Sequence, residues 1–507
     1  YQRRVRGYQK MNDLDENTEA HLTAFLKKVG VDMEQVMAAQ DGQIINECLI
    51  LKKKRYSVRA FKSRSDFKFV FALNLTVITS LMFCDAKNLS ALFAPNVEEI
   101  MDGADLHKNG NGERAGAFSH TSVEGLFFPK LRTVGRCAFF QSSVISLRAP
   151  LLTEVGDYAF YGCPISALSL PSLTVVGEHS FAGCPISSLD LPTLTTAGAS
   201  AFQNCTVTDL KLPKLEAAGQ ECFKATPITN IDAPNLKSVG AGCFSHCPVQ
   251  SVSAPSLVEA DNNAFYNCRI GSLTLPKLAR VGNHCFCNNP ITSLDLPTLV
   301  SAGDFSFYEC QIVSLHLPAL KTAGRYCFYN CPLETLSLPV LESAGEYCFG
   351  DCSLRLLNLP SIKEVGESCF SGCPITCVSL PNAVQIDQSA FEGCRLLEKF
   401  STPKLQKLGE SCFSSCPKLR SLCCGEALDQ LKCHNRICAE RKECLNCTGE
   451  LEKLVLLRNT LKKVVGKQDQ IMQELRNAIR AQQDGVGQIV ETEKNVEALI
   501  GQLQNLK

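Results

Sequence analysis

A pattern of apolar and polar positions repeats every 21 residues through the middle of the chain. Prolines occur at positions 129, 150, 171, 192, 213, 234, 255, 276, 297, 318, 339, 360 and 381, and a fourteenth, Pro403, comes one residue late. The tenth residue after each of these prolines is a phenylalanine, from Phe139 to Phe413. A fixed period of this length is typical of a solenoid in which each repeat forms one turn.

The apolar positions of one unit indicate how each turn folds. The leucines of Leu168–Leu170 alternate with a polar residue, which predicts a short strand, and Pro171 ends that strand because it has no N–H for a ladder bond. Gly177 stands six residues after the proline, where twelve of the fourteen units have glycine and two have aspartate, so we expect a left-handed turn there. Phe181 and Cys184 are three apart, which predicts one face of a short helical turn.

One unit cannot bury these residues, but stacked units can, so we predict an α/β repeat solenoid over residues 95–422. The unit L-x-L-P-x-L-x-x-V-G-x-x-A-F-x-x-C-P-I, seen in Leu168–Ile186, resembles the BspA-type leucine-rich repeat. The resemblance implies a curved, right-handed solenoid with a parallel sheet on its concave side. It also implies a surface or interaction protein, used in that family for adhesion, and does not identify a partner.

The N-terminal 94 residues lack a clear repeat. Residues 1–66 contain helix-period apolar positions between Ala20 and Ala39, so we predict a helical segment. Residues 67–94 contain an apolar run, Phe69–Phe83, which follows a basic cluster and could therefore be a membrane anchor. The basic cluster consists of Lys52, Lys53, Lys54, Arg55, Arg59, Lys62 and Arg64. The apolar run is shorter than the ~20 residues that a span needs. We therefore favour an N-terminal solenoid cap and no membrane span. A phosphate site at the basic cluster is the weaker alternative to a solvated surface.

The C-terminal segment 448–507 has a different pattern, with apolar residues at twelve of the sixteen core positions of eight consecutive heptads. Such a stripe predicts a coiled coil, and hence a homo-oligomer formed through residues 449–507. The glycines in Asp484–Gly487 leave a helical hairpin within one chain as the alternative.

Composition and charge narrow the functional classes. The 507 residues carry 51 basic and 51 acidic side chains, and this zero net charge argues against nucleic acid as the partner. No Gly-rich phosphate loop, H-E-x-x-H or G-x-S-x-G motif occurs, so we predict a non-catalytic protein without a cofactor. We see no secretory signal and expect a cytoplasmic or peripheral location, although the chain starts at Tyr1, which leaves room for a missing leader.

Most of the 29 cysteines fall into two groups. Eleven occupy the thirteenth position after the repeat proline and seven directly precede the repeat phenylalanine, so we interpret them as buried thiols that pack as small apolar residues. The second group lies in residues 423–447, where we predict either a Cys-rich cap or a zinc module. The candidate metal ligands are Cys433, Cys438, Cys444 and Cys447.

The candidate ligand-binding residues follow from the repeat register. Side chains two residues before each proline point outward from the strands, and the charged ones are Arg148, Asp190, Lys211, Asp232, Asp295 and His316. Tyrosines that follow the repeat phenylalanine suggest a second edge for binding, and these are Tyr161, Tyr266, Tyr308 and Tyr329.

These features favour a protein-interaction or adhesion protein, in which the solenoid binds a protein or glycan and the coiled coil clusters it. The alternative is an intracellular structural scaffold or a cytoskeleton-associated adaptor. A zinc-containing ligase or signalling adaptor is the third and weakest hypothesis.

Overall fold

The structure is a computed structural model that describes residues 15–105 and 114–424. The chain divides into two compact units, and nearly all described residues belong to the first, which comprises residues 1–420 and 424–434. The predicted coiled coil at 448–507 and the Cys-rich segment lie almost wholly outside the described residues. Of the second unit, the structure describes only strand β37 (Ser421–Cys423).

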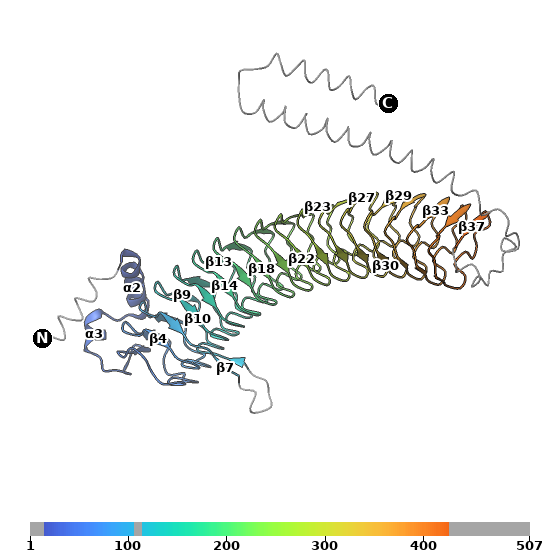
Figure 1. Cartoon of the computed structure of the whole chain (residues 1–507). Coiled ribbons are helices and arrows are strands. Elements are labelled where there is room, and N and C mark those ends of the chain that lie inside the picture. Colours follow the sequence, from blue (N-terminus) through green and yellow to red (C-terminus); the bar gives the residue numbers. More distant parts are fainter. Residues whose placement is uncertain (1–14, 106–113, 425–507) are drawn as a thin grey trace, which may run out of the picture. The chain divides into compact units, whose positions relative to one another are not determined.

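The first unit is a parallel β-solenoid whose turns follow one another along the chain (Figure 1). Each turn contributes a three-residue strand just before the repeat proline, where the sequence predicts it. These strands are β9 (Gly125–Phe127), β11 (Ser146–Arg148), β13 (Ala167–Ser169), β15 (Ser188–Asp190), β17 (Asp209–Lys211), β19 (Asn230–Asp232), β21 (Ser251–Ser253), β23 (Ser272–Thr274), β25 (Ser293–Asp295), β27 (Ser314–His316), β29 (Thr335–Ser337), β31 (Leu356–Asn358), β33 (Cys377–Ser379) and β35 (Lys399–Ser401).

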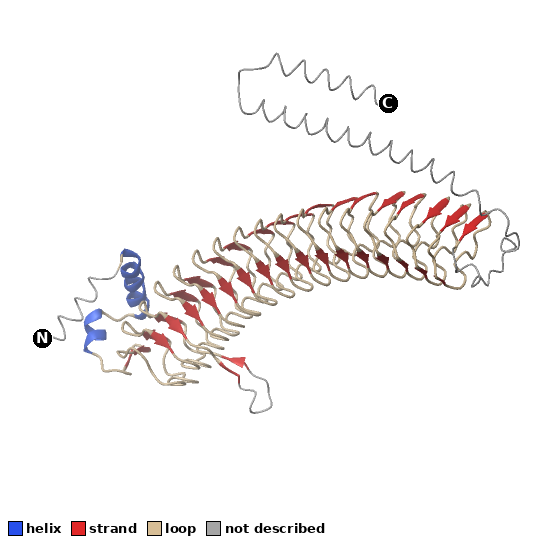
Figure 2. Cartoon of the chain, in the orientation of Figure 1, coloured by secondary structure: helices blue, strands red, loops and turns tan. Residues whose placement is uncertain are grey.

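Each turn also contains a second, two-residue strand that the sequence pattern did not predict, drawn with the others in Figure 2. Sixteen of these strands form one sheet without interruption, because each is shifted from the next by one repeat in parallel register. They are β4 (Val77–Ile78), β6 (Glu99–Ile100), β10 (Thr133–Val134), β12 (Glu154–Val155), β14 (Val175–Val176), β16 (Thr196–Ala197), β18 (Ala217–Ala218), β20 (Ser238–Val239), β22 (Glu259–Ala260), β24 (Arg280–Val281), β26 (Ser301–Ala302), β28 (Thr322–Ala323), β30 (Ser343–Ala344), β32 (Glu364–Val365), β34 (Gln385–Ile386) and β36 (Lys407–Leu408).

The predicted helical turn at the repeat phenylalanine is a pair of tight turns instead. In one unit the amide of Ala182 donates to the carbonyl of His179, and that of Cys184 to that of Phe181. The backbone cannot continue as a helix because the residues eight and twelve positions after the proline are left-handed in every repeat, as at His179 (φ 51°) and Gly183 (φ 72°).

The prediction of a left-handed residue at the repeat glycine, six positions after the proline, is therefore wrong. The left-handed residues lie at positions eight and twelve. Gly177 and its equivalents do not have a positive φ; glycine is needed there because adjacent turns approach closely. A Cβ on Gly219 would lie 2.7 Å from the backbone nitrogen of Ala199 and 2.7 Å from the carbonyl carbon of Gly198. Glycine at this position therefore lets the backbone of each turn lie close to that of the preceding turn, directly after the strand of the sixteen-stranded sheet.

The repeat phenylalanines form the centre of the core. From Phe118 to Phe391 their rings stack from one turn to the next, with centroids between 4.8 Å (Phe118–Phe139) and 5.6 Å (Phe181–Phe202) apart. The last pair, Phe391 and Phe413, is 6.3 Å apart, where the late Pro403 adds one residue to the repeat.

The N-terminal end of the solenoid is covered by helices α2 (Glu16–Val29) and α3 (Met33–Ala38). The helical part of the predicted segment 1–66 thus ends at Ala38. Next, β1 (Ile44–Ile45) forms a hairpin with β2 (Cys48–Ile50), and β2 pairs in parallel with β3 (Phe69–Phe71), which itself pairs with β5 (Ala91–Phe93). The first turns of the solenoid therefore begin within that segment.

An insertion follows β6 in the chain, although β6 still pairs with β10 in the sixteen-stranded sheet. Strands β7 (Ala104–Asp105) and β8 (Arg114–Ala115) pair in antiparallel fashion and form the base of this hairpin. It corresponds to the Gly- and Asn-rich stretch that breaks the repeat register in the sequence.

Candidate binding surfaces

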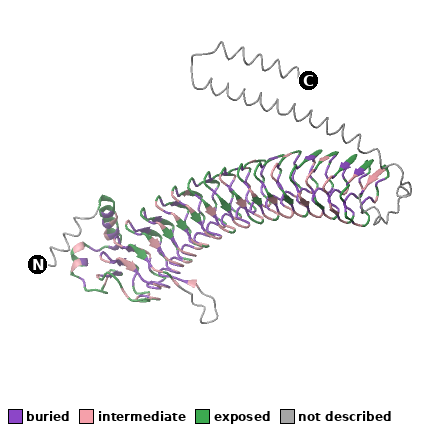
Figure 3. Cartoon of the chain, viewed as in Figure 1, coloured by how far each residue is buried: buried purple, intermediate pink, exposed green. Residues whose placement is uncertain are grey.

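The outward side chains of the three-residue strands form a continuous exposed row, which we call the strand face. The six predicted residues Arg148, Asp190, Lys211, Asp232, Asp295 and His316 are all exposed, because they alternate with apolar residues that point into the solenoid. Figure 3 shows this exposure recurring from turn to turn.

Parallel register sets which of these charges are neighbours. Lys211 lies opposite Asp232, and Asp295 lies opposite His316. Asp190 accepts a hydrogen bond of 2.7 Å from the hydroxyl of Ser169 one turn earlier. The strand face thus presents charges of both signs in a row and does not gather them into a pocket.

Helix α2 sets where the strand face begins. On β3 and β5 the outward positions are apolar, and Phe25 of α2 packs on Phe69, Phe71 and Phe93 at 5.7 to 6.5 Å between ring centroids. The guanidinium of Arg148 lies 5.8 Å from the ring of Phe127, at the boundary of this covered region. From β11 onward most outward residues are polar and exposed, and the apolar exceptions Ala167, Leu356 and Cys377 are exposed as well.

The turns beside the repeat phenylalanines carry a second surface, which we call the aromatic edge. The predicted residues Tyr161, Tyr266, Tyr308 and Tyr329 are half-buried there. The sequence pattern did not reveal a neighbouring column of aromatic residues, eight positions after the proline, that stack from turn to turn. The column consists of Tyr158 and His179, and then His284, Phe305, Tyr326 and Tyr347.

Two columns together form the largest part of this edge. Tyr308 and Tyr329 stack at 5.6 Å, and Tyr326 and Tyr347 stack beside them at 4.8 Å. Their rings meet between columns in edge-on contacts, such as Tyr326 with Tyr329 at 5.4 Å. A recurring aromatic at position eight is visible in the sequence and would have identified this column.

Carboxylates surround these phenols. The hydroxyl of Tyr329 donates a 2.5 Å hydrogen bond to Asp351, and this bond raises the pKa of Tyr329 well above its ordinary value. Partial burial and the nearby Glu309 also raise the pKa of Tyr308. The phenols therefore stay protonated across the physiological range, as hydrogen-bond donors beside negative charge.

The sixteen-stranded sheet carries a shallow groove of about 620 Å³. Its lining consists mostly of small residues such as Ala217, Gly219 and Ser238, and it ends near the ion pair between Glu259 and Arg280. The glycines in this lining are required because the backbones of neighbouring solenoid turns lie close together at these positions.

The repeat cysteines lie in the core and are free thiols in the described residues. Their interpretation as buried side chains agrees with the structure, but packing is not their whole role. Where the residue thirteen positions after the proline is cysteine, its thiol donates to the backbone carbonyl of the repeat phenylalanine in the preceding turn. Cys184, for example, donates to Phe160 at 3.1 Å. Ser142, Thr226 and Asn289 replace cysteine in this column and also donate to a phenylalanine carbonyl.

The predicted zinc ligands Cys433, Cys438, Cys444 and Cys447 lie outside the described residues. Within residues 15–105 and 114–424, no group of three or more His, Cys, Asp or Glu side chains is arranged to hold a metal ion.

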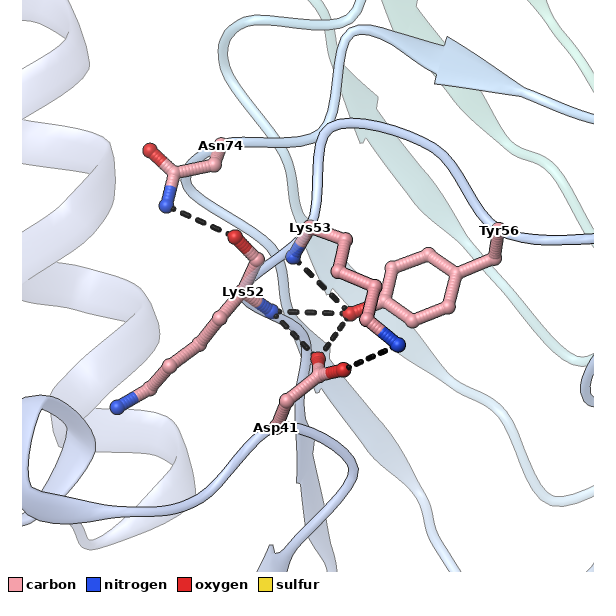
Figure 4. A network of polar contacts seen from close by, with 5 residues as sticks. All are labelled: Asp41, Lys52, Lys53, Tyr56 and Asn74. Carbon is pink, nitrogen blue, oxygen red and sulfur yellow. Dashed lines mark hydrogen bonds and ion pairs between the residues drawn. The ribbon is translucent and has the colours of Figure 1, made fainter.

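Side chains of the N-terminal basic cluster are engaged within the fold: Lys52 donates to the carbonyl of Met37, Lys62 pairs with Asp85 and Arg64 with Asp66. Figure 4 shows the contacts around Lys52 and Lys53. Asp41 accepts hydrogen bonds from the backbone of Lys52 and from the hydroxyl of Tyr56, and it pairs with the ammonium of Lys53 at 3.0 Å. The Lys52 backbone carbonyl accepts from the amide of Asn74 at 3.1 Å. This network ties the loop after α3 to the first solenoid turns.

The apolar run that admitted a membrane anchor forms strands β3, β4 and β5. In the part of the chain that the structure describes, no helix combines the length and apolar character needed to cross a bilayer.

Comparison with known families identifies the repeats. The family described as BspA type Leucine rich repeat region matches residues 114–216, 153–268, 259–331 and 321–434, which together span more than half of the chain. No curated protein sequence matches the chain.

Several solved structures are similar to this chain. A leucine-rich repeat protein from Bacteroides ovatus is 20% identical, with 62% of this chain and 90% of that chain covered and a TM-score of 0.47. A leucine rich cell surface protein from Faecalibacterium prausnitzii is 21% identical, with 54% and 83% covered and a TM-score of 0.33. The functional domain of InlJ from Listeria monocytogenes, which includes a cysteine ladder, is 15% identical, with 66% of each chain covered and a TM-score of 0.24.

Proposed function

Because the chain belongs to the BspA-type leucine-rich repeat family, we propose that its solenoid is a non-catalytic platform that binds a protein partner along the strand face. The observation that carries this proposal is the change in the outward positions at β11. They are apolar where α2 covers them, and from Ser146 onward most of them are polar and exposed, with Ala167, Leu356 and Cys377 as the apolar exceptions. A surface left open over many turns suits an extended partner better than a small ligand.

The charges of the strand face support a protein partner in particular. Lys211 lies between Asp190 and Asp232 in the order of the turns, and all three side chains are exposed. Mixed charge of this kind sets the register of a complementary protein surface and speeds its association. A glycan partner remains the alternative outcome of the test below.

We further propose that residues 449–507 cluster the platforms as a homo-oligomeric coiled coil. Linked copies raise the effective affinity for a multivalent partner without any new contact. A cytoplasmic or peripheral location and a role as a structural scaffold are consistent with the same architecture. Mass photometry of the full chain tests the clustering, because a monomer at micromolar concentration contradicts it.

The partner itself is tested by photo-crosslinking on the full chain. A crosslinker placed at Ser253, on the strand face, is expected to capture a specific protein, whereas one at Lys237, directly before strand β20 of the sixteen-stranded sheet, is not. With the captured protein purified, the double substitution Asp190→Lys and Asp232→Lys should weaken binding by about tenfold or more, because both charges reverse at exposed positions.

The matched control exchanges the ion pair between Glu216 and Lys237, whose charged atoms lie 2.7 Å apart on the other surface. Glu216→Lys with Lys237→Glu conserves both the pair and the net charge, so binding should be unchanged. Equal weakening by the two double substitutions would reject the strand face as the binding surface.

A further inference from the structure

The sixteen-stranded sheet ends at β4, but one further turn of the chain lies beside that strand. The amide of Glu98, three positions after Pro95, donates to the carbonyl of Thr76 at 2.8 Å, and the amide of Thr76 donates to that of Lys54 at 3.0 Å. Residues 54–57 therefore continue the register of the sheet by one turn. No earlier turn of the described chain pairs with them, so their far side forms an edge, which we call the open edge.

The backbone of the open edge has unpaired N–H groups. In a later turn the amides of Lys237 and Gly240 both donate to the preceding turn, each at 2.8 Å. The equivalent amides of the open edge belong to Lys54 and Ser57, and no described residue accepts a hydrogen bond from either of them. An exposed row of this kind is where a sheet can add a further strand.

Two cations line the open edge. Lys54 and Arg55 are both exposed, and within residues 15–105 and 114–424 no carboxylate pairs with either side chain. The guanidinium of Arg55 contacts only the sulfur of Met101, at 3.2 Å. Lysine and arginine on an edge discourage pairing with an apolar strand, so the same charges select an acidic one.

The sheet itself shows what a lysine in this column takes from the preceding turn. Glu216 pairs with Lys237 at 2.7 Å, and Glu342 pairs with Lys363 at 2.6 Å. In both cases the carbonyl of that glutamate also accepts from the amide of the lysine, at 2.8 Å. One acidic residue thus satisfies both the side chain and the backbone of the lysine. Lys54 lies in this column and lacks such a neighbour.

The next column contains the same pairing with an arginine. Arg280 forms an ion pair with Glu259 of the preceding turn, and the amide of Arg280 donates to the carbonyl of Val258 at 3.2 Å. Arg55 lies in the column of Arg280, because it directly follows Lys54. Both cations of the open edge therefore have precedents that pair with a glutamate one turn earlier.

A carboxylate already occupies the adjoining part of this turn. Asp41, from the loop after α3, accepts from the amide of Lys52 at 3.0 Å and pairs with the ammonium of Lys53 at 3.0 Å (Figure 4). Asp41 thus takes the place of a preceding turn for these two residues. At Lys54 and Arg55, which follow directly, no described carboxylate does the same.

We propose that the open edge binds an acidic, extended segment of a protein partner as an additional parallel strand. A glutamate of that segment gives its carbonyl to the amide of Lys54 and its carboxylate to the ammonium, as Glu216 does for Lys237. Val58, which is 54% exposed directly after the open edge, adds an apolar contact. This surface is separate from the strand face, so the inference goes beyond the proposed platform function.

The test uses the full chain and two fluorescein-labelled dodecamers, one of alternating Glu and Thr and one with Gln in place of Glu. Fluorescence anisotropy should show that the Glu peptide binds about tenfold more tightly or better, because glutamine keeps the length and loses the charge. Lys54→Gln and Arg55→Gln should each weaken binding of the Glu peptide by about three- to tenfold. Both variants change only an exposed side chain, so the fold should be retained.

Lys321→Gln is the matched control. Lys321 is exposed in the same column as Lys54, but its amide already donates to the carbonyl of Val300 at 2.8 Å, so no strand can be added there. This substitution removes the same charge and should leave binding unchanged.

Hydrogen exchange read by mass spectrometry tests the backbone part of the proposal. Addition of the Glu peptide should slow amide exchange in residues 54–57, because their free N–H groups become hydrogen-bonded. Exchange in the turn of Lys321 should stay the same.

Equal binding of the two peptides, equal weakening by Lys54→Gln and Lys321→Gln, or unchanged exchange at residues 54–57 would each overturn the inference. Binding to vesicles of phosphatidylserine and phosphatidylcholine that Lys54→Gln abolishes, without binding of the Glu peptide, would overturn it in favour of a membrane surface. Cross-links in the free chain between Lys54 and an acidic residue of residues 425–507 would overturn it in favour of an internal occupant. Each of these failures leaves the strand-face proposal standing, because partner capture at Ser253 is measured independently.

Discussion

Replacing Phe244 by alanine tests whether the stacked phenylalanines couple the turns of the solenoid. The ring of Phe244 is fully buried and lies 5.4 Å from both Phe223 and Phe265. Removal of a buried phenylalanine costs about 3–5 kcal/mol, and each aromatic pair adds about 0.5–1.5 kcal/mol beyond burial. Since two stacked pairs are lost, we expect a cost at the top of that range, about 5 kcal/mol.

Phe413 is the comparison, because it ends the same column. It has one stacked neighbour, Phe391 at 6.3 Å, and an edge-on contact with Phe400 at 4.8 Å. Phe413→Ala should therefore cost about 3 kcal/mol and loosen only the last turns.

Hydrogen exchange read by mass spectrometry, with urea unfolding followed by circular dichroism, measures both effects. In a chain of nearest-neighbour contacts, Phe244→Ala should raise amide exchange in the turns on both sides of residue 244 and broaden or split the unfolding transition. Equal costs for the two variants, or faster exchange confined to the turn of Phe244, would refute the idea that the column couples the turns.

Three further predictions concern the cysteines. The Cys184→Ser variant should be about 1 kcal/mol more stable in urea unfolding than the Cys184→Ala variant, because serine is close to cysteine in volume and keeps a donor for the carbonyl of Phe160. Equal stabilities of the two variants would mean that the thiol only fills space. Burial raises the pKa of Cys163 to about 11 from its ordinary 9.0, so the fold favours the neutral thiol. The stabilisation that the buried neutral thiol gives is complete below pH 9 and is lost as the pH rises through 11. At pH 8, iodoacetamide should accordingly alkylate the exposed Cys377 and spare Cys163 until the chain is denatured, and native labelling of Cys163 at the same rate would contradict this. Elemental analysis of the full chain should find one zinc per chain if the C-terminal cysteines form the predicted metal site, and a chain without bound metal after purification in added zinc would favour the plain cap.

The repeat period by itself determined much of this protein. Proline every 21 residues and phenylalanine ten residues later define the turn, the three-residue strand and the buried column, because each depends on local chemistry that is identical in every repeat. The outward positions of the strand face followed from simple alternation, and the structure shows its six predicted residues exposed.

The repeat also contained signals whose meaning depended on contacts between turns. The glycine six positions after the proline looked like a left-handed residue, yet its cause is the backbone of the neighbouring turn, as at Gly219. The left-handed residues are eight and twelve positions after the proline, and glycine or asparagine fills the twelfth in eight of the fourteen units. The preference for glycine or asparagine at the twelfth position can be recognised in the sequence. The need for glycine at the sixth position is explained only by the close approach of neighbouring turns in the structure.

Tertiary structure alone decided what covers each surface. The sequence does not tell that α2 lies on Phe69, Phe71 and Phe93, so that the strand face begins at β11. Nor does it tell that Arg114, 44 positions before Tyr158, reaches that ring from an insertion. The repeat specifies contacts between residues 21 apart, whereas these contacts join segments that break the repeat, and their partners are set by where the chain folds back in space.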